Sequence, residues 1–327
     1  MIDFDQVVDA LRAAGEPTRL RLLMLLGHAE LTVSELVYIV KQSQPRISRH
    51  LKLLADAGLI ERNREGAWVF YRAQESGPIA QLKDTVTSMA LARTPATDRD
   101  LERLEDVRSQ RRQQAQSYFA ANAAEWNRLR SLHTDDADVE AAMLALLKGR
   151  TFKEHLDIGT GTGRVLELLA PFCERGLGID MSGEMLGVAR ARLSEAGLRR
   201  TQVRLADLFS LPVADETCDL VTVHQVLHYL DDPARALSEA ARALAPGGLL
   251  LIADFAPHMI ESLRTDHQHR RLGFDAAEVE GWLMACGLTL SAQRDLPAGR
   301  PDGLTVSLWL ASTPERALRR RPIKVVT

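Results

Sequence analysis

Three glycines at alternate positions follow an apolar segment near the middle of the chain. The segment reads His155-Leu156-Asp157-Ile158-Gly159-Thr160-Gly161-Thr162-Gly163 and leads into a helix-like pattern. Glycine lets a backbone turn sharply and approach a ligand closely. Asp180 closes the next strand-like segment, 17 residues after Gly163, where an acidic side chain can hold both hydroxyls of a ribose. This order of strand, glycine turn, helix and acid predicts a site for a nucleoside cofactor.

The bulk properties are those of a globular protein. The chain has 327 residues, of which 46% are hydrophobic and 26% are charged, a length that fits one to three domains. No apolar run reaches about 18 residues and no secretory signal opens the chain, so we expect a cytoplasmic protein without membrane contact. The spacing of Cys173, Cys218 and Cys286 fits neither a disulfide framework nor a zinc site, and we expect no metal.

Charge is unevenly distributed along the chain. Residues 41–72 carry seven basic and three acidic side chains, whereas residues 131–312 carry 17 basic and 26 acidic ones. A basic patch in an acidic chain favours one surface that binds phosphates.

The basic region has the pattern of two short helices and a hairpin. Thr32 and Glu35 form a capping box for a helix over Val33–Val40, and a second helix over Pro45–Ala57 ends at Gly58. Polar side chains near the start of a second helix can reach base edges in the major groove of DNA. The alternation in 59–64 and 68–72 indicates a two-stranded wing. The candidate DNA-binding residues are Gln44, Arg46, Ser48, Arg49, His50, Lys52, Arg62 and Arg64, with Arg72 as a further phosphate contact.

Two motifs carry a resemblance to a known family. The segments 16–23 and 43–54 resemble the opening helix and the recognition helix of ArsR/SmtB-type winged-helix transcriptional regulators. The resemblance implies binding to double-stranded operator DNA as a homodimer. Thr32 and Ser34 stand where metal-sensing members carry thiols, and hydroxyls are poor ligands for soft metals, so we expect no metal sensing. The helix predicted over Ile79–Ala92 has an apolar stripe that either pairs two subunits or packs on its own domain; the stripe consists of Ile79, Leu82, Val86, Met89 and Ala90.

Residues 94–150 have the pattern of a helical connector. Pro95 ends the preceding helix, and a charged helix is expected over residues 98–116. Tyr118 and Trp126 follow, and they form either a lid over a ligand or ordinary packing. Beyond this connector, strand and helix patterns alternate, which predicts a mainly parallel sheet with helices on both faces and a ligand at the carboxyl ends of the strands.

The C-terminal motifs resemble class I S-adenosylmethionine (SAM)-dependent methyltransferases of the ubiquinone/menaquinone C-methyltransferase type. The resemblance rests on the G-x-G-x-G spacing, on Asp207 at the end of the third strand, and on Ala245-Pro246-Gly247-Gly248 before an apolar strand. It implies a Rossmann-like, mostly parallel seven-stranded sheet that binds SAM or S-adenosylhomocysteine (SAH). The implied cofactor-binding residues are Asp157, Gly159, Thr160, Gly161, Gly163, Asp180, Met181, Asp207 and Leu208.

No catalytic centre is evident from sequence. His224, His228 and Tyr229 follow the fourth strand, where a methyl acceptor usually lies, and each is a candidate general base or a structural residue. The acceptor-side candidates are Tyr118, Trp126, His267 and Arg270.

The combined prediction is an α/β multidomain protein. We expect a winged helix-turn-helix domain over residues 1–93, a linker and lid over 94–150, a methyltransferase domain over 151–312 and a basic tail over 313–327. We predict that the protein is a transcriptional regulator, and more specifically a repressor, that senses SAM or SAH. The alternative is an active small-molecule methyltransferase, for C- or O-methylation, that also regulates its operon.

Overall fold

The computed structural model describes residues 3–65, 68–74, 77–89, 94–130, 135–263, 269–298 and 303–314, and gives no side chains for residues 65, 68, 112 and 114–130. The chain forms two compact units. The first combines residues 1–121 with residues 183–205, and the second combines residues 122–182 with residues 206–327. None of the helices in the described ranges is long and apolar enough to cross a membrane.

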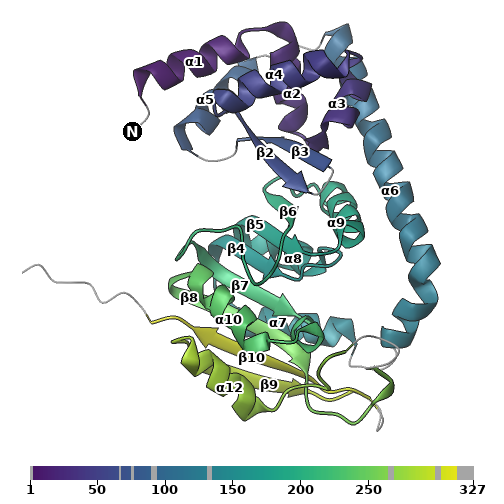
Figure 1. Ribbon diagram of the computed structural model, residues 1–327, viewed down its shortest axis with the longest axis vertical. Coiled ribbons are helices and arrows are strands. Elements are labelled where there is room, and N and C mark those ends of the chain that lie inside the picture. Colours follow the sequence, from purple (N-terminus) through teal and green to yellow (C-terminus); the bar gives the residue numbers. More distant parts are fainter. Residues whose placement is uncertain are drawn as a thin grey trace, which may run out of the picture. The chain divides into compact units, whose positions relative to one another are not determined.

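The first unit contains several short helices, most of one long helix and a small antiparallel sheet (Figure 1). Its helices are α1 (Phe4–Ala14), α2 (Pro17–Leu26), α3 (Val33–Val40), α4 (Gln44–Asp56), α5 (Gly77–Met89), most of α6 (Pro95–Arg130) and α9 (Gly183–Glu195). Strands β1 (Leu31–Thr32), β3 (Trp68–Ala73) and β2 (Ile60–Glu65) lie in that order in one sheet. Helices α3 and α4 followed by the β2–β3 hairpin make the winged helix-turn-helix that the sequence predicts.

Local signals determine where these helices begin. The Thr32 hydroxyl accepts the Glu35 amide at 3.3 Å and the Glu35 carboxylate accepts the Thr32 amide at 2.7 Å, which confirms the predicted capping box. Pro95 is the first residue of α6, a position where its missing N–H leaves no bond unmade. Helix α6 extends beyond the predicted 98–116 because five alanines, which favour helix, occur in residues 115–125.

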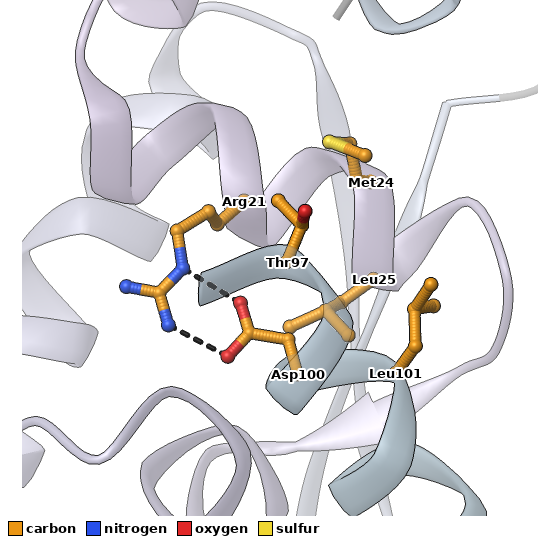
Figure 2. Close-up of a pocket in the computed structure, with 6 residues that line it drawn as sticks. All are labelled: Arg21, Met24, Leu25, Thr97, Asp100 and Leu101. Atoms are coloured by element: carbon orange, nitrogen blue, oxygen red, sulfur yellow. Dashed lines mark hydrogen bonds and ion pairs between the residues drawn. The ribbon is translucent and has the colours of Figure 1, made fainter. Parts of the chain in front are cut away.

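A buried ion pair attaches α6 to α2. The Arg21 guanidinium donates to both carboxylate oxygens of Asp100, each at 2.6 Å, and the Asp100 side chain is only 4% exposed. Figure 2 shows the pair in a small crevice between the two helices, lined by Arg21, Met24, Leu25, Thr97, Asp100 and Leu101. The crevice encloses about 10 Å³, the space of a single water molecule, so we assign it a structural role.

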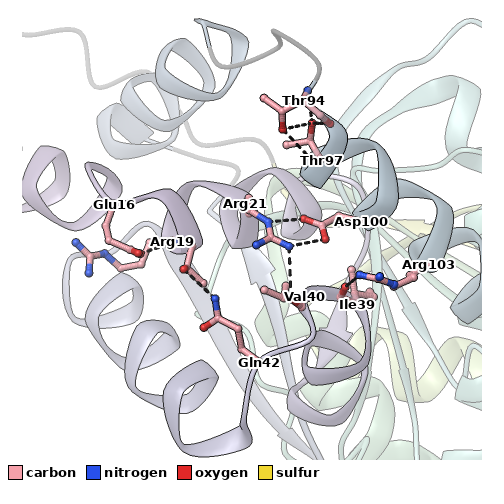
Figure 3. Close-up of polar contacts among 11 residues, drawn as sticks. Glu16, Arg19, Arg21, Ile39, Val40, Gln42, Thr94, Thr97, Asp100 and Arg103 are labelled. Carbon is pink, nitrogen blue, oxygen red and sulfur yellow. Dashed lines mark hydrogen bonds and ion pairs between the residues drawn. The ribbon is translucent and has the colours of Figure 1, made fainter.

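The same arginine helps to cap the end of α3 (Figure 3). Arg21 donates to the Val40 carbonyl at 3.5 Å, and Arg103 of α6 donates to the Ile39 carbonyl at 2.9 Å. The last carbonyls of a helix have no partner within the helix. Helices α2 and α6 therefore stabilise the turn through Lys41, which adopts a left-handed conformation (φ 57°) directly after α3.

The second unit contains most of a seven-stranded sheet. Its order is β6-β5-β4-β7-β8-β10-β9, with β10 antiparallel to β8 and β9, and with β4 parallel to β5 and β7. The strands are β4 (Phe152–Ile158), β5 (Cys173–Asp180), β6 (Thr201–Leu205), β7 (Cys218–His224), β8 (Leu244–Phe255), β9 (Thr289–Leu296) and β10 (Val306–Ser312). The first strand in sequence lies near the middle of the sheet, so the connections leave it in opposite directions, and a ligand is expected where the order switches.

Helices of the second unit cover both faces of this sheet. Helices α10 (Pro233–Ala243) and α12 (Ala276–Ala285) pack in one apolar core with alternate residues of the central strands, such as Leu250 and Ile252. Helices α7 (Asp136–Leu146) and α8 (Arg164–Leu169) pack in a second core with the intervening residues, such as Leu249 and Leu251. Burial on both faces explains the nearly continuous apolar run of β8.

We expect Asp100→Ala to lower the free energy of unfolding by about 3 kcal/mol, because Arg21 stays largely buried and loses its partner. Denaturant unfolding followed by circular dichroism measures the change. Asp9→Ala is the control, since Asp9 and Arg12 form an exposed pair at 3.7 Å. Equal effects of the two substitutions would contradict a structural role for the Arg21–Asp100 pair.

Candidate functional site

Helix α4 presents a polar face away from the core. Ile47, Leu51 and Leu54 are fully buried in the apolar core of the first unit. The exposed residues among the predicted DNA contacts on this helix are Gln44, Arg46, Ser48, Arg49 and Lys52. His50 differs from them, because it is mostly buried and its Nδ1 lies 3.6 Å from a carboxylate oxygen of Glu16. The helix thus combines an apolar inner side with a cationic, hydrogen-bonding outer side.

The hairpin separates its arginines between two faces. Arg62 and Arg64 are exposed on β2. Arg72 on β3 is 8% exposed and donates to the Arg199 carbonyl at 3.3 Å. The expectation that Arg72 contacts phosphate is therefore wrong: successive side chains of a strand point to opposite faces, and Arg72 lies on the covered one.

The three glycines form a turn with left-handed backbone at each glycine. Gly159, Gly161 and Gly163 have φ values of 70°, 52° and 75°, in the left-handed region that favours glycine. The Gly159 and Thr160 amides donate to the Ile179 carbonyl at 2.8 and 2.9 Å. A Cβ at Gly159 would lie 2.2 Å from Cγ2 of Val226. The backbone conformation therefore favours glycine at all three positions, and Gly159 is also required for space.

Asp180 at the end of β5 joins this turn to the next one. One carboxylate oxygen accepts the Gly161 amide at 2.8 Å and the other accepts the Ser182 amide at 2.8 Å. Each carboxylate oxygen has two lone-pair directions, so Asp180 keeps the capacity to accept two hydroxyls.

Asp157, the penultimate residue of β4, is buried with one oxygen unpaired. Its Oδ1 accepts the Thr222 hydroxyl at 2.6 Å, whereas its Oδ2 is buried and has no hydrogen-bond partner among the described residues. Burial raises the pKa of Asp157 to about 6. An unpaired buried acceptor is costly in isolation, and a ligand with an ammonium or hydroxyl donor would satisfy it.

A buried histidine lies behind Asp157. His155 Nε2 is 2.8 Å from the Thr222 hydroxyl, and burial lowers the pKa of His155 to about 3. The single Thr222 proton is donated to Asp157, so the neutral His155 ring must carry its own proton on Nε2 and donate it to Thr222. This series of hydrogen bonds was not predicted from the sequence, although His155 and Asp157 alternate with apolar residues along β4.

The remaining predicted cofactor residues lie after β5 and β6. Met181 is exposed and Leu208 is buried. Asp207 is exposed, and its carboxylate accepts the Phe209 amide at 2.9 Å. We call Asp157, the Gly159–Gly163 turn, Asp180 and Asp207 the strand-end site.

A buried histidine–aspartate pair follows β7. His228 Nδ1 donates to Asp254 Oδ1 at 2.7 Å, and Asp254 also accepts the Leu227 and Phe255 amides at 2.9 and 2.8 Å. The ring of His269 lies 4.2 Å from that of His228, centroid to centroid. Asp254 was not among the candidates, because nothing in its local sequence indicates a partner 26 residues away. His224 is half-buried, and Tyr229 is exposed.

The structure describes only some of the residues that were predicted to lie on the side of the methyl acceptor. Tyr118 and Trp126 lie within α6 where no side chains are described, and His267 lies outside the described residues. Arg270 is largely exposed and lies 3.5 Å from Asp231, atom Nε to Oδ1.

Comparisons with known proteins identify two domains. Residues 16–62 match the model of the bacterial regulatory protein, arsR family. Residues 156–252 match the model of a methyltransferase domain. The first match includes α4, and the second includes Asp157, the glycine turn, Asp180 and Asp207.

Several known proteins are similar to parts of the chain. An uncharacterized 37.1 kDa protein in transposon TN4556 of Streptomyces fradiae is 36% identical, over 49% of this chain and 47% of the relative. The demethylmenaquinone methyltransferase of Thermus thermophilus is 36% identical, over 42% of this chain and 64% of the relative. YcgJ of Bacillus subtilis has a solved structure that superposes with a TM-score of 0.47 at 20% identity, covering 54% of this chain and 98% of that one.

The chain spans less than two thirds of the length of these curated relatives. The match to the arsR family covers α2, α3 and α4, and the match to the methyltransferase domain covers strands β5, β6 and β7 with the glycine turn. The chain therefore combines a segment that matches the arsR family of bacterial regulatory proteins with a segment that matches a methyltransferase domain, in one polypeptide.

Proposed function

We propose that this protein is a transcriptional repressor that binds operator DNA through α4 and responds to SAM or SAH. The observation that carries the proposal is the outer face of α4, where Arg46 and Arg49 are exposed in a protein that also contains the strand-end site. Arginine pairs with guanine and glutamine pairs with adenine in the major groove. Arg62 and Arg64 of the hairpin would contact phosphates and so position the helix.

The strand-end site suits an adenosyl amino acid. The unpaired Asp157 Oδ2 would accept the ammonium of its amino-acid part, and Asp180 would accept the ribose hydroxyls. Asp207 would accept from the adenine amino group, with Met181 and Leu208 flanking the ring. The Gly159–Gly163 turn at the end of β4 would let its backbone approach the ligand closely.

A homodimer is part of the proposal. Most of the predicted α5 stripe packs on its own unit, because Ile79, Leu82 and Val86 lie against the core. Met89 remains 81% exposed, and Phe4 of α1 is 78% exposed. Helices α1 and α5 contact each other, and a second copy that packs there would cover both exposed side chains. Two copies would suit an operator with two half-sites.

The second candidate function is methyl transfer to a small molecule. The His228–Asp254 pair favours it, because an imidazole held by a carboxylate at Nδ1 keeps Nε2 as a base. Bound SAM would supply the methyl group, and the protein would orient the acceptor and receive its proton. The proposed regulator requires no turnover, and the two functions are compatible in one chain.

We expect SAM or SAH to change the affinity of the full-length protein for its operator by about 10-fold, a usual size for coupled sites. Fluorescence anisotropy with labelled operator DNA, titrated with and without each compound, measures the change. Equal operator affinity in all three conditions would contradict the effector role.

Substitutions in the two domains should separate the two binding activities. We expect Arg49→Ala to weaken specific operator binding by at least about 10-fold, the loss of one base-reading arginine, and to leave SAH affinity unchanged. We expect Asp180→Ala to weaken SAH binding and to reduce the response of operator affinity to SAH. Calorimetry and anisotropy on both variants test this, and loss of SAH binding in Arg49→Ala would contradict separate sites.

We expect the buried, charged Asp157 carboxylate to destabilise the folded protein. Because its folded pKa of about 6 lies above its unfolded value, the native state loses stability as the pH rises from about 4 to about 6. We therefore expect Asp157→Asn to unfold at a higher temperature than wild type at pH 7, by a margin that vanishes below about pH 4. SAH affinity should fall in the same variant, because a neutral amide replaces the acceptor for the ammonium.

Thermal unfolding from pH 4 to pH 7 and calorimetry at pH 7 measure both effects. Glu174→Gln is the control, since Glu174 is an exposed carboxylate on β5. A lower unfolding temperature for Asp157→Asn at pH 7 would contradict the assignment of an unsatisfied buried charge.

A further inference from the structure

Helix α9 and strand β6 are attached to the winged helix by a nearly buried arginine. Arg190 of α9 lies 3.1 Å from Glu30, Nε to Oε2, and the two side chains are 10% and 13% exposed. Its guanidinium also lies 3.9 Å from the centroid of the Phe70 ring in β3. An arginine that combines a shielded ion pair with an aromatic contact is bound far more firmly than one in an exposed surface pair.

Two more contacts extend this attachment along the hairpin. Arg204 of β6 lies 3.4 Å from Glu61 of β2. Arg72 of β3 donates to the Arg199 carbonyl between α9 and β6 at 3.3 Å. The segment 183–205 therefore contacts both strands of the hairpin.

These contacts use one face of the hairpin. In the register of β2 and β3, Glu61 is opposite Arg72 and Asn63 is opposite Phe70, and directly paired residues lie on the same face of a sheet. Arg62 and Arg64 alternate with Glu61 and Asn63, so they lie on the other face and are exposed. The attachment to α9 and β6 thus leaves the proposed phosphate contacts accessible.

The segment begins and ends beside the nucleoside acids. Helix α9 begins three residues after Asp180, and β6 ends two residues before Asp207. Asp180 accepts the Ser182 amide through its carboxylate at 2.8 Å and the Ala206 amide through its carbonyl at 3.1 Å. A change in the geometry of Asp180 therefore acts on both ends of the segment through covalent and hydrogen-bonded backbone.

We propose that residues 183–205 are a coupling segment, through which an adenosyl ligand at Asp180 and Asp207 alters the position or mobility of the β2–β3 hairpin. The inference rests on the proposed function, because it specifies the route by which the effector reaches the DNA-binding surface. Coupling requires that the ligand binds more tightly with one state of the hairpin than with the other. The Arg190–Glu30 and Arg204–Glu61 pairs are the contacts that would differ between the two states.

Hydrogen–deuterium exchange of the full-length protein tests the coupling without DNA. In wild type, saturating SAH should change the exchange rates of hairpin amides in residues 60–73 by at least about 5-fold, the lower end of usual coupling between sites. In Arg190→Ala the hairpin response should disappear while calorimetry shows unchanged SAH affinity. The reversed pair Glu30→Arg with Arg190→Glu should restore part of the response. Arg175→Ala is the matched control, because Arg175 pairs with Glu154 at the opposite end of β5 from Asp180.

The outcomes separate this inference from the proposed function. Unchanged hairpin exchange in SAH-saturated wild type, or a full response in Arg190→Ala, would overturn the coupling segment even if operator affinity responds to SAH. A hairpin response without any change in operator affinity would support the segment and overturn the effector role. Failure of wild type to bind SAH would overturn both. If Arg190→Ala does not fold, Glu61→Gln replaces it, because its pair with Arg204 is more exposed and a reduced response is then expected.

Discussion

The carboxylate of Asp180 holds together the part of the molecule on which the functional account depends. Its two oxygens accept amides from the glycine turn after β4 and from the turn before α9, and its carbonyl accepts the amide that follows β6. Three turns at the carboxyl ends of neighbouring strands thus meet at one residue. Ribose binding by Asp180 would therefore act on all three turns, which is why a ligand there can influence residues that it does not contact.

The apolar interior of the sheet also contains a series of hydrogen-bonded polar side chains. Asp157, Thr222 and His155 are buried and joined by hydrogen bonds, yet one Asp157 oxygen has no partner among the described residues. Proteins rarely retain such an atom without a use for it. A positively charged ligand group would remove the cost of the unpaired oxygen, so affinity and stability are linked at this position.

The elements that sequence predicted are those set by local rules. Positive φ values at Gly159, Gly161 and Gly163, the Thr32–Glu35 box and the alternation in the hairpin depend on neighbouring residues, and the strands and helices lie near their predicted ranges. Contacts between distant segments were not predictable. Glu30 and Arg190 are 160 residues apart in the sequence. Arg72 was predicted to contact phosphate because two other arginines of the hairpin lie nearby in the sequence, and only its burial in the structure shows otherwise.

A crystal structure of the protein grown with SAH tests the central claim most directly. The account predicts an ammonium nitrogen within hydrogen-bond distance of Asp157 Oδ2, ribose hydroxyls on Asp180, and the adenine beside Met181 and Asp207. Density for SAH elsewhere in the protein, or a strand-end site closed by side chains at saturating SAH, would contradict it.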